Sequence, residues 1–383
     1  MISMAIPAPI QAAMNQAVQD GVFPGAVLAV RLCGELRILA VCGRLSSDPS
    51  GERVQTSTIY DLASLTKPLV TVTSILLLVQ GGKLLLDDPI EKYLVELNGS
   101  PIGQATVRDL LSYTSGLPGW RPLYERLKGK GVAKGQGSPS VLRLAVLQII
   151  GDEPLIYRKG ERSLYSDLGF ILLGLAIERI TELTLDGHYQ KTVVEPLSAH
   201  PLRFAPLGEG VSGNYTNSAV QRSMIAPTEW DDWRGRLLCG EVHDENAAAM
   251  GGVAGHAGLF GTAESVLAVT GSWIQAYRGR SSILHGELVR EFTMKRSELP
   301  QSSWALGWDT PSTLSSSGTY FSQQSFGHLG YTGTSIWIDP VKELEVVLLS
   351  NRVHPSRKNE LIRAFRPKVH DLVSRELGMS NGR

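Results

Sequence analysis

A serine and a lysine stand three residues apart in an otherwise apolar segment near the amino-terminal end. The segment "DLASLTKPLVTVTSILLLV" (residues 61–79) contains Ser64 and Lys67. On a helix, residues three apart are neighbours, so the lysine ammonium group can lie beside the serine hydroxyl. A serine hydroxyl is a weak nucleophile unless a base activates it. The pair therefore predicts a nucleophilic serine with an activating lysine.

The environment of Lys67 bears on that role. Its apolar neighbours Leu65, Leu69 and Val70 would desolvate the ammonium group, and desolvation lowers the pKa of a lysine. With a lowered pKa, Lys67 could accept the serine proton. The alternative interpretation is structural, because a lysine near a helix end can extend its charge to solvent along an apolar surface.

A tyrosine in "GERSLYSDLGFILLG" (residues 160–174) is the second candidate. Tyr165 precedes an apolar segment typical of a helix, and Ser166 or Asp167 could cap that helix. A phenol beside a lysine cation would become more acidic and could transfer protons. The alternative is a packed tyrosine whose hydroxyl group has a backbone partner.

The third candidate is "FGHLGYTGTSIWIDP" (residues 326–340). Its glycines allow a strand to approach a substrate or to offer an oxyanion-binding amide, with His328 as a possible donor. The alternative is a glycine-rich strand end with a surface histidine. A second glycine-rich stretch, "MGGVAGHAGLFGTAES" (residues 250–265), predicts a tight backbone path of structural importance.

The elements that must position these residues predict an α+β fold, an antiparallel β-sheet flanked by helices. A hairpin is expected over residues 25–43 and short strands over 303–310, 335–340 and 344–351, with a last helix over 358–377. We therefore expect residues 1–82 and 250–383 to form one discontinuous α/β domain. Residues 83–249 would form a mostly helical inserted domain, with the active site in the cleft between the two.

Composition excludes several classes of protein. Lys+Arg and Asp+Glu both number 37, so no basic nucleic-acid footprint is present. The longest apolar run, Leu69–Val79, is short of the roughly 20 residues of a membrane span. No lysine or arginine precedes Arg31, so no signal peptide is expected, and the location would be cytoplasmic, or periplasmic if a leader preceded Met1.

Three cysteines and one acidic loop are the candidates for redox or metal sites. Cys33, Cys42 and Cys239 have no CxxC spacing and are expected to be packing residues. The loop "GEVHDENAAAMGG" (residues 240–252) gathers three acids and His243, but it has no HExxH pattern. We therefore expect no metal and no cofactor, and a hydrogen-bonded loop beside the site.

Three further patterns are weaker. "GMSNG" (residues 378–382) matches the nucleophile elbow G-x-S-x-G but follows a helix rather than a strand, so it is rejected. "NYTN", with Tyr215 and Asn217, is a rival to the tyrosine motif at Tyr165, but it lacks the apolar helix that follows Tyr165. Asn351 and Arg352 end a strand, where they could meet a substrate carboxylate or simply lie on the surface.

Taken in order, these motifs resemble a known superfamily. "SLTK" (64–67), "LLSYTSGLP" (110–118), "YSD" (165–167), "GGVAGHAGLFGTAE" (251–264) and "GHLGYTGTSIWIDP" (327–340) are similar to the serine β-lactamases and penicillin-binding proteins. The likeness spans Gly25 to about Pro355 and is greatest to the class C β-lactamase-like branch, which includes DD-carboxypeptidases and family VIII carboxylesterases.

The resemblance implies a role for each matching residue. Ser64 would be the acylated nucleophile, Lys67 its activating partner and Tyr165 a proton shuttle to and from the leaving group. The backbone N–H groups of Ser64 and Tyr331 would form the oxyanion hole, and each such donor is typically worth about 3 kcal/mol. The sequence His328-Leu329-Gly330 takes the place of the family's Lys-Thr-Gly strand.

Two residues depart from the family pattern. Asp167 stands where the family usually has an asparagine that binds the substrate, and an ionised aspartate offers only acceptors. His328 replaces a lysine that helps to hold a substrate carboxylate. Asp167, His328 and Gly330 are accordingly expected to bind substrate, with a specificity other than that of an efficient β-lactamase.

The resulting prediction is a cofactor-free serine hydrolase that forms an acyl-enzyme on Ser64. Its substrate would be a small ester, a β-lactam or a D-amino-acid peptide, and the oligomeric state stays open. The alternative is a non-catalytic member of the fold that binds peptidoglycan-like peptides or a partner protein.

Overall fold

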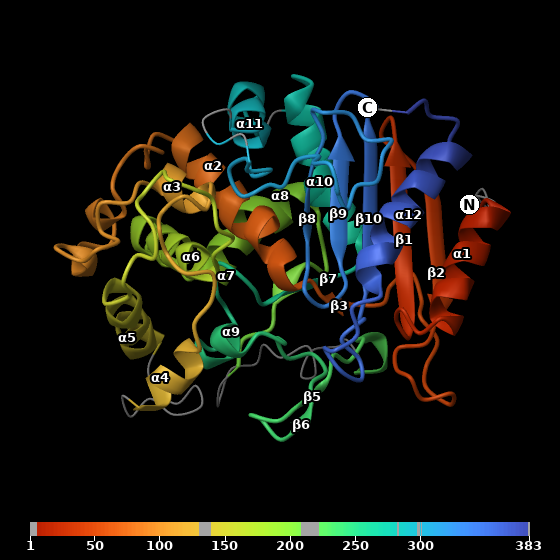
Figure 1. Cartoon of the computed structure of the whole chain (residues 1–383), viewed down its shortest axis with the longest axis horizontal. Helices are drawn as coiled ribbons and strands as arrows, with labels where there is room; N and C mark the ends of the chain where they lie inside the picture. The colour runs from red at the N-terminus through yellow and green to blue at the C-terminus, as the bar shows by residue number, and fades with distance from the viewer. Residues whose placement is uncertain are drawn as a thin grey trace.

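The largest sheet among the described residues is five-stranded and antiparallel, and it lies on the right-hand side of Figure 1. The computed structural model describes residues 6–129, 139–207, 222–281, 283–296, 299 and 301–381. The strand order is β2-β1-β10-β9-β8. The strands are β1 (Gly25–Leu32), β2 (Glu35–Gly43), β8 (Phe326–Leu329), β9 (Ser335–Asp339) and β10 (Leu344–Ser350). Strands from both ends of the chain thus pair, since β1 is hydrogen-bonded to β10 along its length. The predicted fold class is confirmed.

Both faces of this sheet are covered. Helices α1 (Ala8–Gln19) and α12 (Ile362–Glu376) pack together on one face, and α10 (Ala263–Tyr277) lies on the other. Along β1, Leu28 and Val30 join the core under α1 and α12, whereas Val27 and Ala29 join the larger core on the opposite side. Alternate residues of a strand point to opposite faces, so the unbroken apolar run of β1 fits a strand buried on both sides.

The segment between the outer strands is mostly helical. Its helices are α2 (Thr73–Gln80), α3 (Val107–Leu111), α4 (Leu123–Gly129), α5 (Pro139–Gly151), α6 (Asp167–Thr181), α7 (Leu185–Tyr189), α8 (Glu195–Leu197), α9 (Glu245–Ala249) and, beyond α10, α11 (Gly286–Thr293). Two small sheets complete the described residues, formed by β3 (Tyr60–Asp61), β7 (Leu259–Gly261) and β4 (Arg203–Phe204), and by β5 (Trp230–Asp231) and β6 (Arg236–Leu237). The domain boundaries near residues 82 and 250 stay a prediction.

One expected strand is wrong. Residues 303–310 form no strand and make only isolated bridges, from Trp304 to Asp309 and from Asp309 to Gly327. The cause is a tight turn, in which Gly307 has a φ of 76° and its N–H donates to the Leu111 carbonyl. The alternating apolar pattern of this segment instead places Trp308 in the core.

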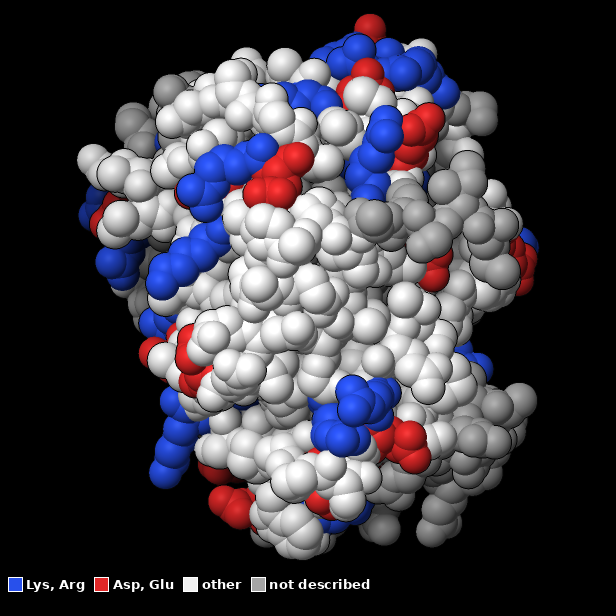
Figure 2. Space-filling model, turned by 90° about the vertical axis from the view of Figure 1, so that its right-hand side faces the viewer, with Lys and Arg blue, Asp and Glu red and all other residues white. Residues whose placement is uncertain are grey.

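One described stretch, Ala63–Gln80, is long and apolar enough for a membrane span by composition, but 78% of it is buried inside the protein. Such burial is typical of a core helix. On the face of the molecule over α1, β2 and α12, Figure 2 shows basic and acidic side chains interspersed around a broad uncharged area. The described residues on this face form no single-sign charged surface of the kind that binds nucleic acid.

Candidate active site

The nucleophile segment, named after the predicted role of Ser64, begins in a strained turn. Ser64 lies in a short 3₁₀ turn (Ala63–Leu65), and Ala63 has a φ of 49°, in the left-handed region that residues other than glycine rarely adopt. The carboxylate of Asp61 accepts hydrogen bonds from the N–H groups of Ala63 (2.8 Å) and His243 (2.6 Å). Strain of this kind persists only where the surroundings enforce it, and it is concentrated at functional sites.

The next turn is a π-helix over Lys67–Val72, with Pro68 in its first turn. Proline has no N–H to donate, so a start at this position costs no hydrogen bond. Single π turns occur often at functional sites. This turn brings Lys67 Nζ to 3.1 Å from Ser64 Oγ, so the predicted contact of the pair is present.

Lys67 is completely buried and surrounded by oxygen atoms. Besides Ser64 Oγ, its Nζ contacts Asp167 Oδ1 at 2.6 Å and the His256 carbonyl oxygen at 3.2 Å. The ring of Tyr165 lies 4.8 Å from the same nitrogen, and the Tyr165 hydroxyl interacts with both Lys67 and Ser64. Four of the sequence-predicted residues, Ser64, Lys67, Tyr165 and Asp167, thus meet at one nitrogen atom.

Two expectations about proton affinity are wrong. Burial lowers the pKa of Lys67, but the charge of Asp167, aided by Tyr165, outweighs burial, so the pKa lies above the ordinary 10.5. Burial likewise raises the pKa of Tyr165 above 10 and prevails over the opposing effect of Lys67. At neutral pH the site therefore holds a lysine ammonium ion and a neutral phenol, because an acid 100 residues away in sequence pairs with the lysine.

Tyr165 lies two residues before α6, and Ser166 occupies the N-cap position. The Ser166 hydroxyl does not cap the helix, because it donates instead to the Pro118 carbonyl at 2.7 Å. The Tyr165 ring belongs to an aromatic cluster with Tyr113, Trp304 and His328, with centroids 5.0 to 6.0 Å from its own. Tyr113 has a φ of 60°, a strained value for a bulky residue. Sequence reasoning missed Trp304 as a component of the site.

The turn after β8 (residues 330–334) packs directly on the nucleophile segment. Thr332 donates its hydroxyl hydrogen to the Asp61 carbonyl (2.7 Å), and Thr334 donates to the Leu62 carbonyl (3.1 Å). A Cβ atom on Gly330 would lie 2.6 Å from the Leu62 carbonyl oxygen, so only glycine permits this approach. The contacts place Tyr331, the second predicted oxyanion donor, on a turn anchored two to three residues before Ser64.

An arginine from the last helix holds the same turn. Arg366 Nη2 donates to the carbonyls of Gly330 (2.9 Å) and Thr334 (2.8 Å), and the side chain is only 5% exposed. Burial, together with the nearby cations Arg352 and Arg363, lowers the pKa of Arg366 to about 9. Sequence reasoning missed Arg366, because nothing in its helical context indicates a backbone partner 36 residues away.

Arg352 is neither free nor on the surface. It is buried, its guanidinium lies 4.5 Å from the Tyr331 ring centroid, and its Nε donates to the Tyr331 carbonyl at 2.8 Å. Its Nη1 donates to the carbonyls of Arg357 and Asn359. Asn351 Nδ2 is likewise occupied by two backbone carbonyls. Both residues therefore position backbone in this structure.

His328 is buried, with 1% of its surface exposed. Its Nδ1 lies 2.8 Å from the Leu329 carbonyl oxygen. Burial and the neighbouring Lys67 charge lower the pKa of His328 to about 3, so the imidazole is neutral at neutral pH. Its Nε2 has no hydrogen-bond partner among the described residues.

The acidic loop lies beside the site in a hydrogen-bonded network. His243 Nε2 is 2.9 Å from Glu229, and His256 Nε2 is 2.8 Å from Asp244, whose carboxylate also caps α9 at the Ala247 N–H. These contacts fit the predicted hydrogen-bonded loop. The His256 carbonyl reaches Lys67, so the second glycine-rich stretch also contributes to the site. The pair Tyr215 and Asn217 lies outside the described residues.

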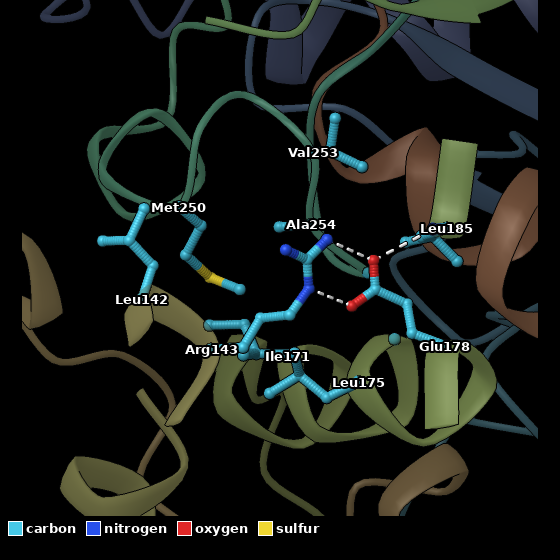
Figure 3. A pocket seen from close by; sticks show the side chains of 11 residues that line it. Leu142, Arg143, Ile171, Leu175, Glu178, Leu185, Met250, Val253 and Ala254 are labelled. Carbon is cyan, nitrogen blue, oxygen red and sulfur yellow. Dashed lines mark hydrogen bonds and ion pairs between the residues drawn. The ribbon is translucent and has the colours of Figure 1, made fainter. Parts of the chain in front are cut away.

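A small pocket lies behind this stretch, between α5, α6 and residues 250–255 (Figure 3). Its internal space is about 10 Å³, at the lower limit of what can hold one water molecule. Arg143 and Glu178 form a bidentate ion pair across it, and Glu178 also accepts from the Leu185 N–H at 3.0 Å. The charges of Arg143 and Glu178 are thus paired with each other, and the pocket is too small for a substrate.

Comparison with known proteins agrees with this geometry. The Beta-lactamase family model matches residues 10–368. Proteins of Escherichia coli (strain K12) and Salmonella agona, each provisionally named D-alanyl-D-alanine carboxypeptidase, are both 32% identical to the chain. The alignments cover 79% of this chain and 71% of the E. coli protein, and 83% and 73% for the Salmonella protein.

Three solved structures share the fold at about 20% sequence identity. EstCE1, a hydrolase with promiscuous acyltransferase activity, has a TM-score of 0.69 over 94% of this chain and 97% of its own. The octameric penicillin-binding protein homologue from Pyrococcus abyssi has a TM-score of 0.71 over 97% and 77%. Unliganded simvastatin synthase from Aspergillus terreus has a TM-score of 0.70 over 96% and 98%. With its family match over nearly its whole length, the chain belongs to the Beta-lactamase family of serine hydrolases and penicillin-binding proteins.

Proposed function

We propose that the protein hydrolyses acyl compounds through an acyl-enzyme on Ser64. The observation that supports this most strongly is the contact of Ser64 Oγ with Lys67 Nζ at 3.1 Å, with the Tyr165 hydroxyl interacting with both. A fully buried lysine beside a serine hydroxyl and a phenol is costly to maintain for structure alone. Such arrangements are typical of activated nucleophiles.

The protonation states of Lys67 and Tyr165 favour a proton relay through the Tyr165 hydroxyl. Since Lys67 is an ammonium ion and Tyr165 a neutral phenol, neither is a free base at rest. As Ser64 Oγ attacks the carbonyl carbon, its proton passes to the Tyr165 oxygen while the Tyr165 proton passes to the leaving group. Lys67 keeps its charge and stabilises the negative charge that develops on both oxygens. Water reverses the relay and releases the acid from Ser64.

The oxyanion would be bound by the backbone N–H groups of Ser64 and Tyr331. The first follows the strained residue Ala63, and the second lies on the turn held by Arg366. Backbone donors fixed in advance stabilise the transition state without reorganising during the reaction. Residues Asp61 and Arg366 then serve as positioning residues for the two donors.

Esters, D-alanyl peptides and β-lactams are the candidate substrates, in keeping with relatives named as carboxypeptidases and a structural neighbour named as an acyltransferase hydrolase. The second candidate function is a non-catalytic member that binds peptidoglycan-like peptides. It lacks a specific supporting observation, because an unreactive pocket does not need the Lys67 ammonium buried against Ser64.

Covalent labelling tests the proposal. We expect a fluorescent fluorophosphonate, and to a smaller extent a fluorescent penicillin, to add one label per chain at Ser64, located by peptide mass spectrometry. The Ser64→Ala variant should take up neither label and lose p-nitrophenyl butyrate hydrolysis by about 10⁴-fold or more. If both probes leave Ser64 unmodified in folded protein, the hydrolase proposal is wrong.

A further inference from the structure

We propose that this site selects acyl substrates whose leaving group is uncharged and carries a hydrogen-bond donor, and discriminates against leaving groups that end in a carboxylate. The inference rests on the proposed function and specifies its substrate class. Four features support it: the neutral His328 imidazole, the pairing of Lys67, the occupied arginines and the aromatic cluster around Tyr165.

His328 offers an acceptor where the leaving group has to lie. A carbonyl oxygen only accepts, so Nδ1 carries the proton that is donated to the Leu329 carbonyl, and Nε2 keeps its lone pair. Nε2 is fully buried and has no partner among the described residues. Buried polar atoms are nearly always satisfied, so an unpaired acceptor beside a nucleophile indicates a partner supplied by the substrate.

The position of His328 ties that acceptor to the leaving group. Its ring lies 6.0 Å from the Tyr165 ring and 5.6 Å from the Trp304 ring, centroid to centroid. In the proposed relay, Tyr165 gives its proton to the leaving group, which must therefore come close to the same aromatic cluster. An amide N–H or a hydroxyl can donate to Nε2, whereas a carboxylate has nothing to donate.

The positive charges described above do not compensate a carboxylate for the hydrogen bond that it cannot make to His328. The Lys67 ammonium is already neutralised by Asp167 at 2.6 Å, and Asp244 adds a second carboxylate close enough to interact with Lys67. Arg352 and Arg366 donate to backbone carbonyls of the neighbouring turn and of residues 357–359. The hydroxyls of Thr332 and Thr334 are used in the same way. Arg366 Nε has no partner among the described residues, but it is buried, so an incoming carboxylate would meet mainly acceptors and occupied donors.

Two esters that differ at one group test this directly. The butyryl esters of D-lactate and of D-lactamide share the acyl group and the ester bond, but one leaving group ends in a carboxylate and the other in a carboxamide. We expect kcat/KM for the lactamide ester to exceed that for the lactate ester by about ten-fold or more, the usual size of one unmatched buried polar group. The measurement uses the unmodified protein.

A substitution then tests the cause. His328→Lys places a cation at this position and should shift the kcat/KM ratio toward the lactate ester by about ten-fold, whatever its effect on the absolute rates. His285→Lys makes the same change at an exposed site at the start of α11 and should leave the ratio unchanged.

The outcomes separate this inference from the proposed function. Equal rates, a preference for the lactate ester or no turnover of either ester would overturn the inference, while labelling of Ser64 would still support the hydrolase. An unchanged ratio in a folded His328→Lys variant would overturn the role of His328. Only the failure of Ser64 to take up an acylating probe overturns both.

Discussion

The site contains two buried cations, Lys67 beside Ser64 and Arg366 against the turn at residues 330–334, and they are stabilised in different ways. Lys67 faces a carboxylate, and its pKa is raised. Arg366 faces only carbonyl oxygens, and its pKa is lowered to about 9. The carboxylate partner keeps a charge in place beside the nucleophile, whereas the carbonyl partners fix the shape of a backbone turn. The cation with a proposed part in the chemistry is thus paired with a carboxylate. The cation that positions backbone has only carbonyl partners, so part of the cost of burying its charge is not offset.

The largest expected effect comes from removing the paired cation. Lys67→Ala should lower kcat/KM by about 10³-fold or more, since both the charge beside Ser64 and the relay geometry are lost. The free energy of unfolding should fall by about 3 kcal/mol, because Asp167 is left without its partner. Chemical denaturation and steady-state kinetics measure the two effects.

A double variant separates the effect of Lys67→Ala on activity from its effect on stability. Lys67→Ala combined with Asp167→Asn should regain much of the lost stability without regaining activity. Full activity in Lys67→Ala would contradict the proposed role of the lysine.

Removing the Asp167 carboxylate while Lys67 is kept should change how activity depends on pH. Without Asp167, burial is the strongest remaining influence on Lys67 and lowers its pKa. Activity that depends on the ammonium form should persist in the unmodified protein to above pH 10.5, while the alkaline limb of kcat/KM in Asp167→Asn should move down by about one pH unit or more. Kinetics from about pH 6 to about pH 11 on folded protein measure the shift.

The opposite outcome is equally informative. If Asp167→Asn becomes more active as the lysine loses its proton, Lys67 acts as a base and the relay through Tyr165 is wrong.

Removing the unpaired cation should act on catalysis through geometry. Arg366→Met frees the turn at residues 330–334, so the Tyr331 N–H is held less accurately and kcat should fall by about ten-fold or more. KM should change by less than about three-fold, because the interaction is made in the transition state. Arg363→Met changes an exposed arginine on the same helix and should change neither constant. A rise in KM with constant kcat would assign Arg366 to substrate binding instead.

The smallest effect is expected behind the site. Arg143→Met breaks the partly exposed pair with Glu178 and should cost about 1 kcal/mol of unfolding free energy. Since the pocket in Figure 3 holds no catalytic group, kcat/KM should stay within about two-fold. A loss greater than about ten-fold would show that this pocket is coupled to the nucleophile segment.

Local patterns predicted the helix after Tyr165 and the last helix, four of the five strands of the large sheet in outline and the contact of Ser64 with Lys67. Each of these depends on residues close in sequence, such as the three-residue spacing of the pair. The strand expected over residues 303–310 is wrong because its alternating pattern arises from packing around Gly307 rather than from pairing.

Proton affinity and backbone contacts could not be predicted in this way. The pKa of Lys67 depends on Asp167, a partner from another element, so the apolar neighbours in sequence predict the wrong direction. The contacts of the His256 carbonyl with Lys67 and of Arg366 with Gly330 involve main-chain oxygens, which every residue possesses. Such contacts have no residue-type signature, and only the folded chain reveals them.

The pairing of β1 with β10 has a consequence for synthesis. The ribosome completes Leu32 long before Leu344, its partner in the sheet, and at about 5–20 residues per second the interval is about 15–60 s. For most of that time Ser64 has been synthesised but the turn at residues 330–334 has not, and Arg366 emerges later still. In the proposed mechanism, a nascent or carboxy-terminally shortened chain therefore carries Ser64 without its oxyanion site, and full activity requires the last helix to dock.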